Sequence, residues 1–77
     1  MFFNNKIKIV NVDGMECKKC ADTISDELNR ISNVKSVKVN IEKKEVIVKY
    51  RNDVDNTEIS DSIERVGYTV TGIRDKK

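Results

Sequence analysis

Histidine, proline and tryptophan are all absent from this 77-residue sequence, and only two of its residues are cysteines. Histidine is the side chain that most readily transfers protons near neutral pH, and the sequence also lacks a glycine-rich loop suited to phosphate. No candidate base for activating a nucleophile is evident. No apolar run is long enough to cross a membrane. These absences argue against an enzyme and against a membrane-spanning protein.

The charge of the chain is nearly balanced, with 15 basic and 13 acidic residues and a net charge of +2. Hydrophobic residues make up 38% and charged residues 36%, a balance typical of a globular domain. The lysines alternate with carboxylates, and aromatic residues are few, so we expect no nucleic-acid partner. A chain of this length cannot support two cores, and a single domain over residues 1–77 is expected.

The N-terminal segment MFFNNKIKIVNV, residues 1–12, carries no targeting signal that we can identify. It lacks a cationic start, a long apolar stretch and a small-residue cleavage site. We therefore expect a mature chain in the cytoplasm. In that reducing compartment, cysteines remain thiols.

Hydrophobic periodicity predicts six secondary-structure elements. The β-branched run 6–12 predicts a strand, and we expect its Val10 and Val12 face to enter the core. Apolar residues spaced by three and four predict a helix over 18–31 and a second one that starts near 55–57 and ends before Gly67. Two alternating segments predict a hairpin, YTVTGI predicts a last strand, and RDKK is expected to be a polar tail. The apolar positions that predict the helices and the hairpin are Ala21, Ile24, Leu28 and Ile31; Ile59, Ile63 and Val66; Val37, Val39 and Ile41; and Val46, Val48 and Tyr50.

The predicted order of elements is βαββαβ. Each helix has one apolar stripe and each strand one apolar face, so both helices are expected to cover one face of a four-stranded antiparallel sheet. This α+β arrangement is the ferredoxin-like sandwich, or split βαβ fold. In it, the loop that carries both cysteines and the segment Gly67-Tyr68 should be neighbours at one end of the sheet.

Both cysteines lie in the stretch DGMECKKCAD, residues 13–22. A structural disulfide is disfavoured because the compartment is reducing and the loop between Cys17 and Cys20 is short. Packing of the cysteines as small hydrophobes suits Cys20 but not Cys17, which is flanked by charged residues. A dithiol redox site remains an alternative, although the sequence lacks the proline that such sites place in the cis form against their sulfurs.

A metal site explains more of this stretch. Two thiolates three residues apart at the start of a helix can converge on one ion, and the positive end of the helix favours their deprotonated form. Zinc normally requires four ligands, so it would have to recruit Glu16 or Asp13 as an oxygen donor. Cu(I) is soft and is satisfied by two sulfurs. Cys17 and Cys20 are therefore candidate Cu(I) ligands.

The residues GMECKKC resemble the GMxCxxC motif of heavy-metal-associated domains, the family of copper chaperones and of the N-terminal domains of metal-transporting P-type ATPases. The resemblance extends to the hairpin VKVNIEKKEVIV and to the late ERVGY. It implies a ferredoxin-like fold, Cu(I) ligation by Cys17 and Cys20, and a Met15 side chain that points into the core. It also implies a position near the metal for Tyr68. From the residues alone, an ordinary aromatic at the edge of a strand is an equally good interpretation of Tyr68.

The function that we expect is a cytoplasmic Cu(I) metallochaperone that transfers copper by thiolate exchange to a copper-transporting P-type ATPase or its metal-binding domain. A metal-bridged homodimer is a further expectation. Lys18 and Lys19 could meet an acidic partner surface. Glu16 occupies a position at which many copper members of the family have a different residue type. Zn(II) or Cd(II) therefore remains an alternative for the bound metal. The alternatives are a regulatory domain of such an ATPase and a dithiol oxidoreductase.

Overall fold

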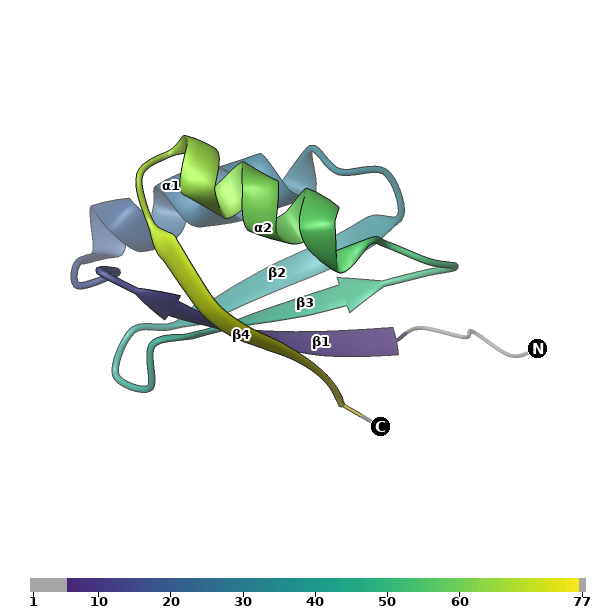
Figure 1. Cartoon of the computed structure of the whole chain (residues 1–77), viewed down its shortest axis with the longest axis horizontal. Coiled ribbons are helices and arrows are strands. Elements are labelled where there is room, and N and C mark those ends of the chain that lie inside the picture. The colour runs from purple at the N-terminus through teal and green to yellow at the C-terminus, as the bar shows by residue number, and fades with distance from the viewer. Residues whose placement is uncertain (1–5, 77) are drawn as a thin grey trace.

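The computed structural model describes residues 6–76, which form four strands and two helices (Figure 1). The expected absence of a targeting signal depends partly on residues 1–5, which lie outside the described residues. No helix in the described part of the chain has the length and apolar character needed to cross a membrane. The elements are β1 (Lys6–Asp13), α1 (Lys18–Asn29), β2 (Val34–Asn40), β3 (Glu45–Tyr50), α2 (Asn56–Arg65) and β4 (Thr69–Lys76).

The strands form one sheet in the order β2-β3-β1-β4, and every neighbouring pair is antiparallel. Both helices lie on the same face of this sheet (Figure 1). The predicted α+β class and ferredoxin-like sandwich are confirmed. β1 lies between β3 and β4. It pairs with β3 through Asn11 and with β4 through Asp13, so the strand is fixed by the sheet up to the loop that carries the cysteines.

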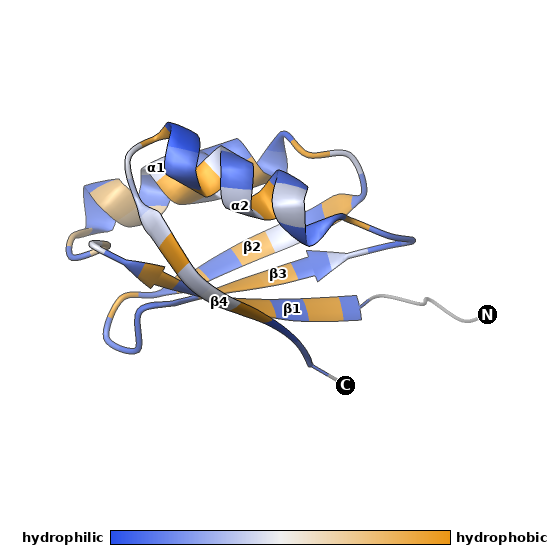
Figure 2. Ribbon diagram, in the orientation of Figure 1, coloured by the Kyte–Doolittle hydropathy of each residue, from blue (hydrophilic) through white to orange (hydrophobic). Residues whose placement is uncertain are grey.

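The core lies between the helices and the sheet. Val10 and Val12 are at most 1% exposed, so the predicted choice of face for β1 is confirmed. Ile7 and Ile9 alternate with them along β1 and are half-buried, so they face the other side of the sheet. Hydrophobic and hydrophilic residues follow one another along the strands in Figure 2. Alternation along a strand follows from its period of two. The side chains that are fully buried are Met15, Ile24, Leu28, Ile59, Ile63, Val10, Val12, Val46 and Val48.

The end of α1 differs from the prediction, because the helix stops at Asn29 and not at Ile31. The backbone N–H of Arg30 donates to the carbonyl of Glu27, and that of Ile31 donates to the carbonyl of Leu28 at 3.1 Å. These three-residue bonds tighten the last turn and end the α-helical pattern. Ile31 is still buried, so its apolar spacing predicted its burial correctly and its secondary structure wrongly.

The hairpin also begins its turn earlier than predicted, since β2 ends at Asn40 and leaves Ile41 in the turn. The side-chain oxygen of Asn40 accepts a hydrogen bond from the backbone N–H of Lys43 at 3.1 Å, and Lys44 adopts a positive φ of 57°. Asparagine side chains stabilise such turns in place of strand pairing. The predicted hairpin is confirmed, with its turn at residues 41–44, and the assignment of Ile41 to a strand was wrong.

The predicted polar tail is wrong for Arg74 to Lys76, because β4 continues through Lys76. Asp75 pairs with Lys8 of β1 across the sheet, and its Oδ1 lies 2.9 Å from the Lys8 Nζ. The side chain of Lys8 is only 8% exposed and sits 5.2 Å from the centre of the Tyr50 ring. The strand persists because residues 74–76 pair with β1 in the sheet and because Arg74 and Asp75 find charged partners on β3 and β1. The local sequence does not reveal these partners.

Candidate metal centre

The loop between β1 and α1 carries both cysteines. Gly14 follows the last residue of β1 with φ at +90°, a conformation that favours glycine, and turns the chain toward the helix layer. Cys17 is the N-cap of α1, with an extended backbone. Its sulfur accepts a hydrogen bond from the backbone N–H of Cys20 at 3.4 Å. The first turn of the helix therefore brings Cys20 back toward Cys17.

The two sulfur atoms lie 2.9 Å apart, and both cysteines are free thiols. A disulfide bond would be about 2.05 Å long, so this contact is a hydrogen bond and not a covalent link. Metal–thiolate bonds of about 2.3 Å, the length found for zinc, allow two sulfurs on one ion to stand at most about 4.6 Å apart. Both sulfurs can therefore reach one ion. Cys17 is exposed and Cys20 is half-buried, so an ion or another thiol reaches the pair from solvent.

The environment of Cys20 favours its thiolate form. The pKa of Cys20 is lowered to about 7, first by the hydrogen bond with Cys17 and next by hydrogen bonding from the Tyr68 hydroxyl. Backbone N–H groups of the loop and the helix start contribute in the same direction, and burial opposes them. A hydrogen bond to the charged form of an acid stabilises that form. Because the thiolate is the form that binds soft metals, this site exposes a ligand that is substantially deprotonated near neutral pH.

Tyr68 lies at this end of the molecule, between α2 and β4, as the predicted order of elements requires. A Cβ placed on Gly14 would lie 3.7 Å from Cδ1 of Tyr68. Gly67, with φ at +99°, ends α2 and turns the chain toward this position. The pKa of Tyr68 is raised, first by its hydrogen bond with Cys20. The predicted proximity of Gly67-Tyr68 to the cysteine loop is confirmed.

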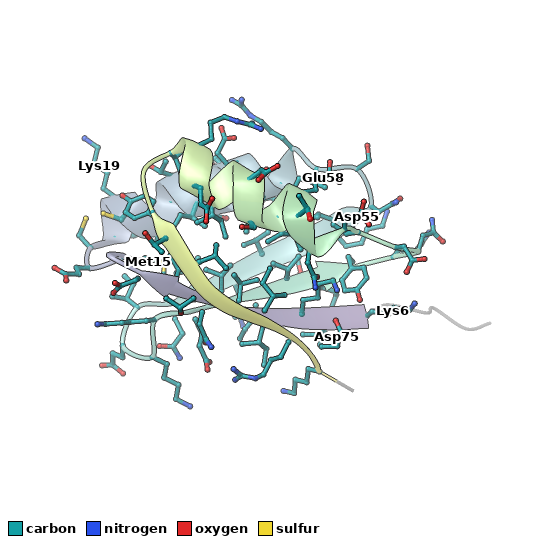
Figure 3. The ribbon with its side chains drawn as sticks, viewed as in Figure 1. Lys6, Met15, Lys19, Asp55, Glu58 and Asp75 are labelled. Atoms are coloured by element: carbon teal, nitrogen blue, oxygen red, sulfur yellow. The ribbon has the colours of Figure 1, made fainter. Side chains whose placement is uncertain are left out.

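Met15 does not belong to the exposed part of the loop. Its side chain is 0% exposed and belongs to the core cluster, and Figure 3 shows it directed inward between the helices and the sheet. The predicted inward orientation of Met15 is confirmed. The thioether therefore anchors the loop on the core, while Cys17, two residues later, remains at the surface.

The charged residues around the cysteines are all exposed. Asp13 and Glu16 were the carboxylates considered for zinc, but within residues 6–76 no three side chains of the types His, Cys, Asp and Glu are placed to hold one metal ion. Lys18 and Lys19 occupy the first turn of α1, and Lys19 projects away from the body of the molecule (Figure 3). The two lysines therefore place exposed positive charge at the start of α1, and neither carboxylate completes a ligand set with the thiols.

Two features of this site were not predicted from the sequence. One is the role of Cys17 as the N-cap of α1, which orients its sulfur toward the first-turn amides. The other is the hydrogen bond between Tyr68 and Cys20, which joins residues 48 positions apart. A cysteine immediately before an apolar helical stripe was the available signal for the first feature. The second depends on the crossing of elements in space and has no local signal.

Comparison with known proteins places this site in a family. Residues 9–69, most of the chain, match the family model described as "Heavy-metal-associated domain". The chain belongs to the heavy-metal-associated domain family. Among relatives of this domain, copper chaperone CopZ of Staphylococcus aureus (strain bovine RF122 / ET3-1) is 39% identical over 64 residues, which cover 82% of this chain and 94% of that protein. Copper chaperone CopZ of Enterococcus hirae is 41% identical over 59 residues, covering 75% of this chain and 86% of that protein.

Solved structures agree with the sequence relatives. A structure described as CopZ metallochaperone superposes on this heavy-metal-associated domain with a TM-score of 0.81 and 38% sequence identity. The superposition covers 84% of this chain and 98% of that chain. The similarity therefore includes most of the sandwich, and the expected family resemblance is confirmed.

Proposed function

We propose that this heavy-metal-associated domain is a Cu(I) carrier that holds its cargo between Cys17 and Cys20. The observation that carries the proposal is the pair of free sulfurs 2.9 Å apart at the start of α1, one of them with a pKa lowered to about 7. Cu(I) accepts two thiolates as a sufficient ligand set. The similarity to copper chaperones at 39% and 41% identity supports copper as the cargo.

The exposure of Cys17 supports transfer by ligand exchange. A thiolate of the acceptor would form a new bond to Cu(I), and the bond from Cys17 and then that from Cys20 would break as a second acceptor thiolate binds. Copper remains Cu(I) throughout, and no electron is transferred. The acceptor that we propose is a copper-transporting P-type ATPase or its metal-binding domain. A metal-bridged homodimer, in which two copies of this chain share one ion, is a separate part of the proposal. Free thiols require a reducing compartment, and we propose the cytoplasm.

Cu(I) competition against a strong chelator tests the ligands. We expect one Cu(I) per chain, or per bridged pair of chains, and a loss of affinity of several orders of magnitude in Cys17→Ser, because a hydroxyl is a poor ligand for a soft ion. Met15→Leu is the matched control, since it removes the third sulfur of the loop and nearly preserves side-chain volume. Its Cu(I) affinity should equal that of the wild type. Equal affinities in the wild type and Cys17→Ser would refute the assignment.

Transfer kinetics test the role proposed for the lysines beside the site. Replacing Lys18 and Lys19 with glutamate should slow Cu(I) transfer to an acidic acceptor domain at low salt and leave Cu(I) affinity nearly unchanged, because exposed charges steer encounter. The loss should diminish as salt rises, since screening acts over about 8–10 Å near physiological ionic strength. Lys19→Glu and Lys35→Glu make a matched pair of single charge reversals. Lys35 lies near the other end of the sheet, so its reversal should have little effect.

A dithiol oxidoreductase is the second candidate, and one observation favours it. A pKa near 7 is also found for the attacking cysteine of thioredoxin-like enzymes. Insulin reduction with a fixed supply of dithiothreitol separates the candidates. We expect no acceleration above free dithiothreitol at equal thiol concentration. A clear acceleration that is lost in Cys17→Ser would replace the carrier proposal with a redox function.

A further inference from the structure

The charges of this domain are separated between its two layers. The two helices carry six acidic and three basic residues, whereas the four strands carry seven basic and three acidic ones. The small net charge of +2 therefore hides a polarised molecule. Polarised surfaces attract partners of the opposite sign and orient them before contact.

The sheet face that the helices leave uncovered combines this positive charge with an apolar centre. Ile7, Ile9 and Ile47 are half-buried, and they are not among the partly buried hydrophobic residues that pack against the core. Ile9 and Ile47 are directly opposite each other on β1 and β3. The three isoleucines therefore form one apolar strip across the two central strands, on the side away from the cysteines and the helices.

Basic residues flank this strip in the strand register. Lys49 and Lys76 lie opposite Ile7 on its two sides, Arg74 lies opposite Ile9, and Lys38 lies opposite Ile47. Glu45 is the acidic residue of β3 on this face, and Arg74 holds it in an ion pair of 3.0 Å. Among residues 6–76, no ion pair neutralises Lys38, Lys49 or Lys76. The outer sheet face, defined by these eight residues, is therefore an apolar strip with an uncompensated basic rim.

We propose that the outer sheet face docks a protein partner whose surface has an apolar centre and an acidic rim. Charge complementarity argues against a symmetric pair of this chain, because two copies joined by this face would bring lysines against lysines. The isoleucines are half-buried between long lysine side chains, whereas insertion into a lipid surface requires exposed apolar residues. Because the thiols lie in the helix layer, a partner bound here leaves Cys17 and Cys20 accessible.

The isoleucines could be present only because β-branched residues favour strands. The test therefore separates a role in binding from strand propensity alone. The probe is a synthetic helical peptide with a leucine stripe bordered by glutamates, titrated into the isotopically labelled full chain and followed by amide shifts. Shifts should be confined to the outer strand residues and should weaken with salt. A peptide with serines in place of the leucines, and one with lysines in place of the glutamates, should each bind at least about tenfold more weakly, because the face requires both features.

Three variants locate the binding. Lys49→Glu should weaken binding at least about tenfold, whereas Lys43→Glu, the same charge change in the turn between β2 and β3, should not. Ile47→Thr keeps a β-branched residue in the strand and should also weaken binding, with circular dichroism and thermal unfolding confirming the fold. Shifts centred on α1, equal binding of all three peptides, or unchanged binding by Ile47→Thr would overturn the proposal. Binding only to phosphatidylserine vesicles would also overturn the proposal and would assign the outer sheet face to a membrane. Concentration-dependent shifts on this face without peptide would overturn it as well and would assign the face to a second copy of this chain.

Discussion

Removing the hydroxyl of Tyr68 should raise the pKa of Cys20. That hydroxyl is the second largest cause of the lowered pKa, after the hydrogen bond with Cys17. Tyr68→Phe keeps the ring beside Gly14 and removes only the hydrogen bond, so the loop should keep its shape. The charged form of Cys20 then loses one stabilising partner, and more of the thiol stays protonated near neutral pH.

The size of the effect has an upper limit. With a pKa of about 7, about half of Cys20 is thiolate at pH 7, whereas about 1% would be thiolate at the reference value of 9.0. A full return of Cys20 to this reference pKa would therefore reduce the thiolate fraction at pH 7 about 50-fold. The Cys17 contact is the larger cause and remains in the variant, so the fall in Tyr68→Phe should be smaller than this limit.

Alkylation by iodoacetamide across a pH series measures this change, with peptide mass spectrometry separating Cys20 from Cys17. The midpoint of the pH profile is the deciding quantity, because a thiolate of higher pKa is also intrinsically more nucleophilic and partly compensates the rate. In the wild type, the midpoint for Cys20 should lie near 7. In Tyr68→Phe it should lie higher. Cu(I) uptake should follow, since protons compete with the metal for the sulfur below the midpoint.

Tyr50→Phe is the matched control for this experiment. Tyr50 is the other tyrosine of the chain, is 5% exposed and lies beside Lys8 at the opposite end of β1 from the cysteines. Its hydroxyl does not contribute to the pKa of Cys20. An unchanged midpoint in Tyr68→Phe, or the same shift in both variants, would refute the role assigned to the Tyr68 hydroxyl.

Three further predictions concern the core, the buried ion pair and the choice of metal. Met15→Ala should lower the free energy of unfolding by about 2–5 kcal/mol in denaturant titrations, because a fully buried side chain leaves a cavity; a change within error would contradict the anchoring role. Asp75→Ala should cost about 1–3 kcal/mol, at the lower end because the Asp75 side chain is 69% exposed, and Lys8→Met combined with it should recover most of the loss. Burial lowers the pKa of Lys8, but the hydrogen bond and charge of Asp75 and the contacts with Tyr50 outweigh burial and raise the pKa above 10.5. The stability that this ion pair contributes should therefore be present below pH 10.5 and be lost as the pH rises above that value. Glu16→Ala should leave Cu(I) affinity nearly unchanged, and it should weaken Zn(II) binding only if the Glu16 carboxylate moves to the ion. Paired competition titrations with both metals measure this, and tight Zn(II) binding that depends on Glu16 would favour a zinc role.

Much of the fold could be predicted because the decisive signals are local. Alternation in β1 and helical spacing from Ala21 to Leu28 arise from strand and helix geometry, which repeats in every protein. Gly67 marked the end of α2 because few other residues adopt its positive φ. The errors fell at element ends. Ile41 was assigned to a strand because its apolar character continued the alternation, while a hydrogen bond from the backbone N–H of Lys43 to the side-chain oxygen of Asn40 had already started the turn.

The prediction of the tail failed for a different reason. Arg74 to Lys76 are polar, and polarity at a chain end usually indicates an unstructured segment. In the structure, these residues are paired with β1, and Asp75 contacts the nearly buried Lys8 from a position 67 residues away in sequence. A buried lysine is stabilised only by such a partner, and neither residue reveals the other along the chain.

The sequence by itself determined the order of elements, the core faces of the two helices and of β1 to β3, and the identity of the two thiols, because each of these follows from residue type and spacing within one segment. Only the tertiary structure decided how those thiols behave. The fold brings Tyr68 from the end of α2 to Cys20, directs Met15 into the core and leaves Cys17 exposed, and it separates a basic sheet face from the helix layer. The pKa of a thiol and the charge of a surface depend on groups within a few ångströms, and distance in space is set by packing and not by position in the chain.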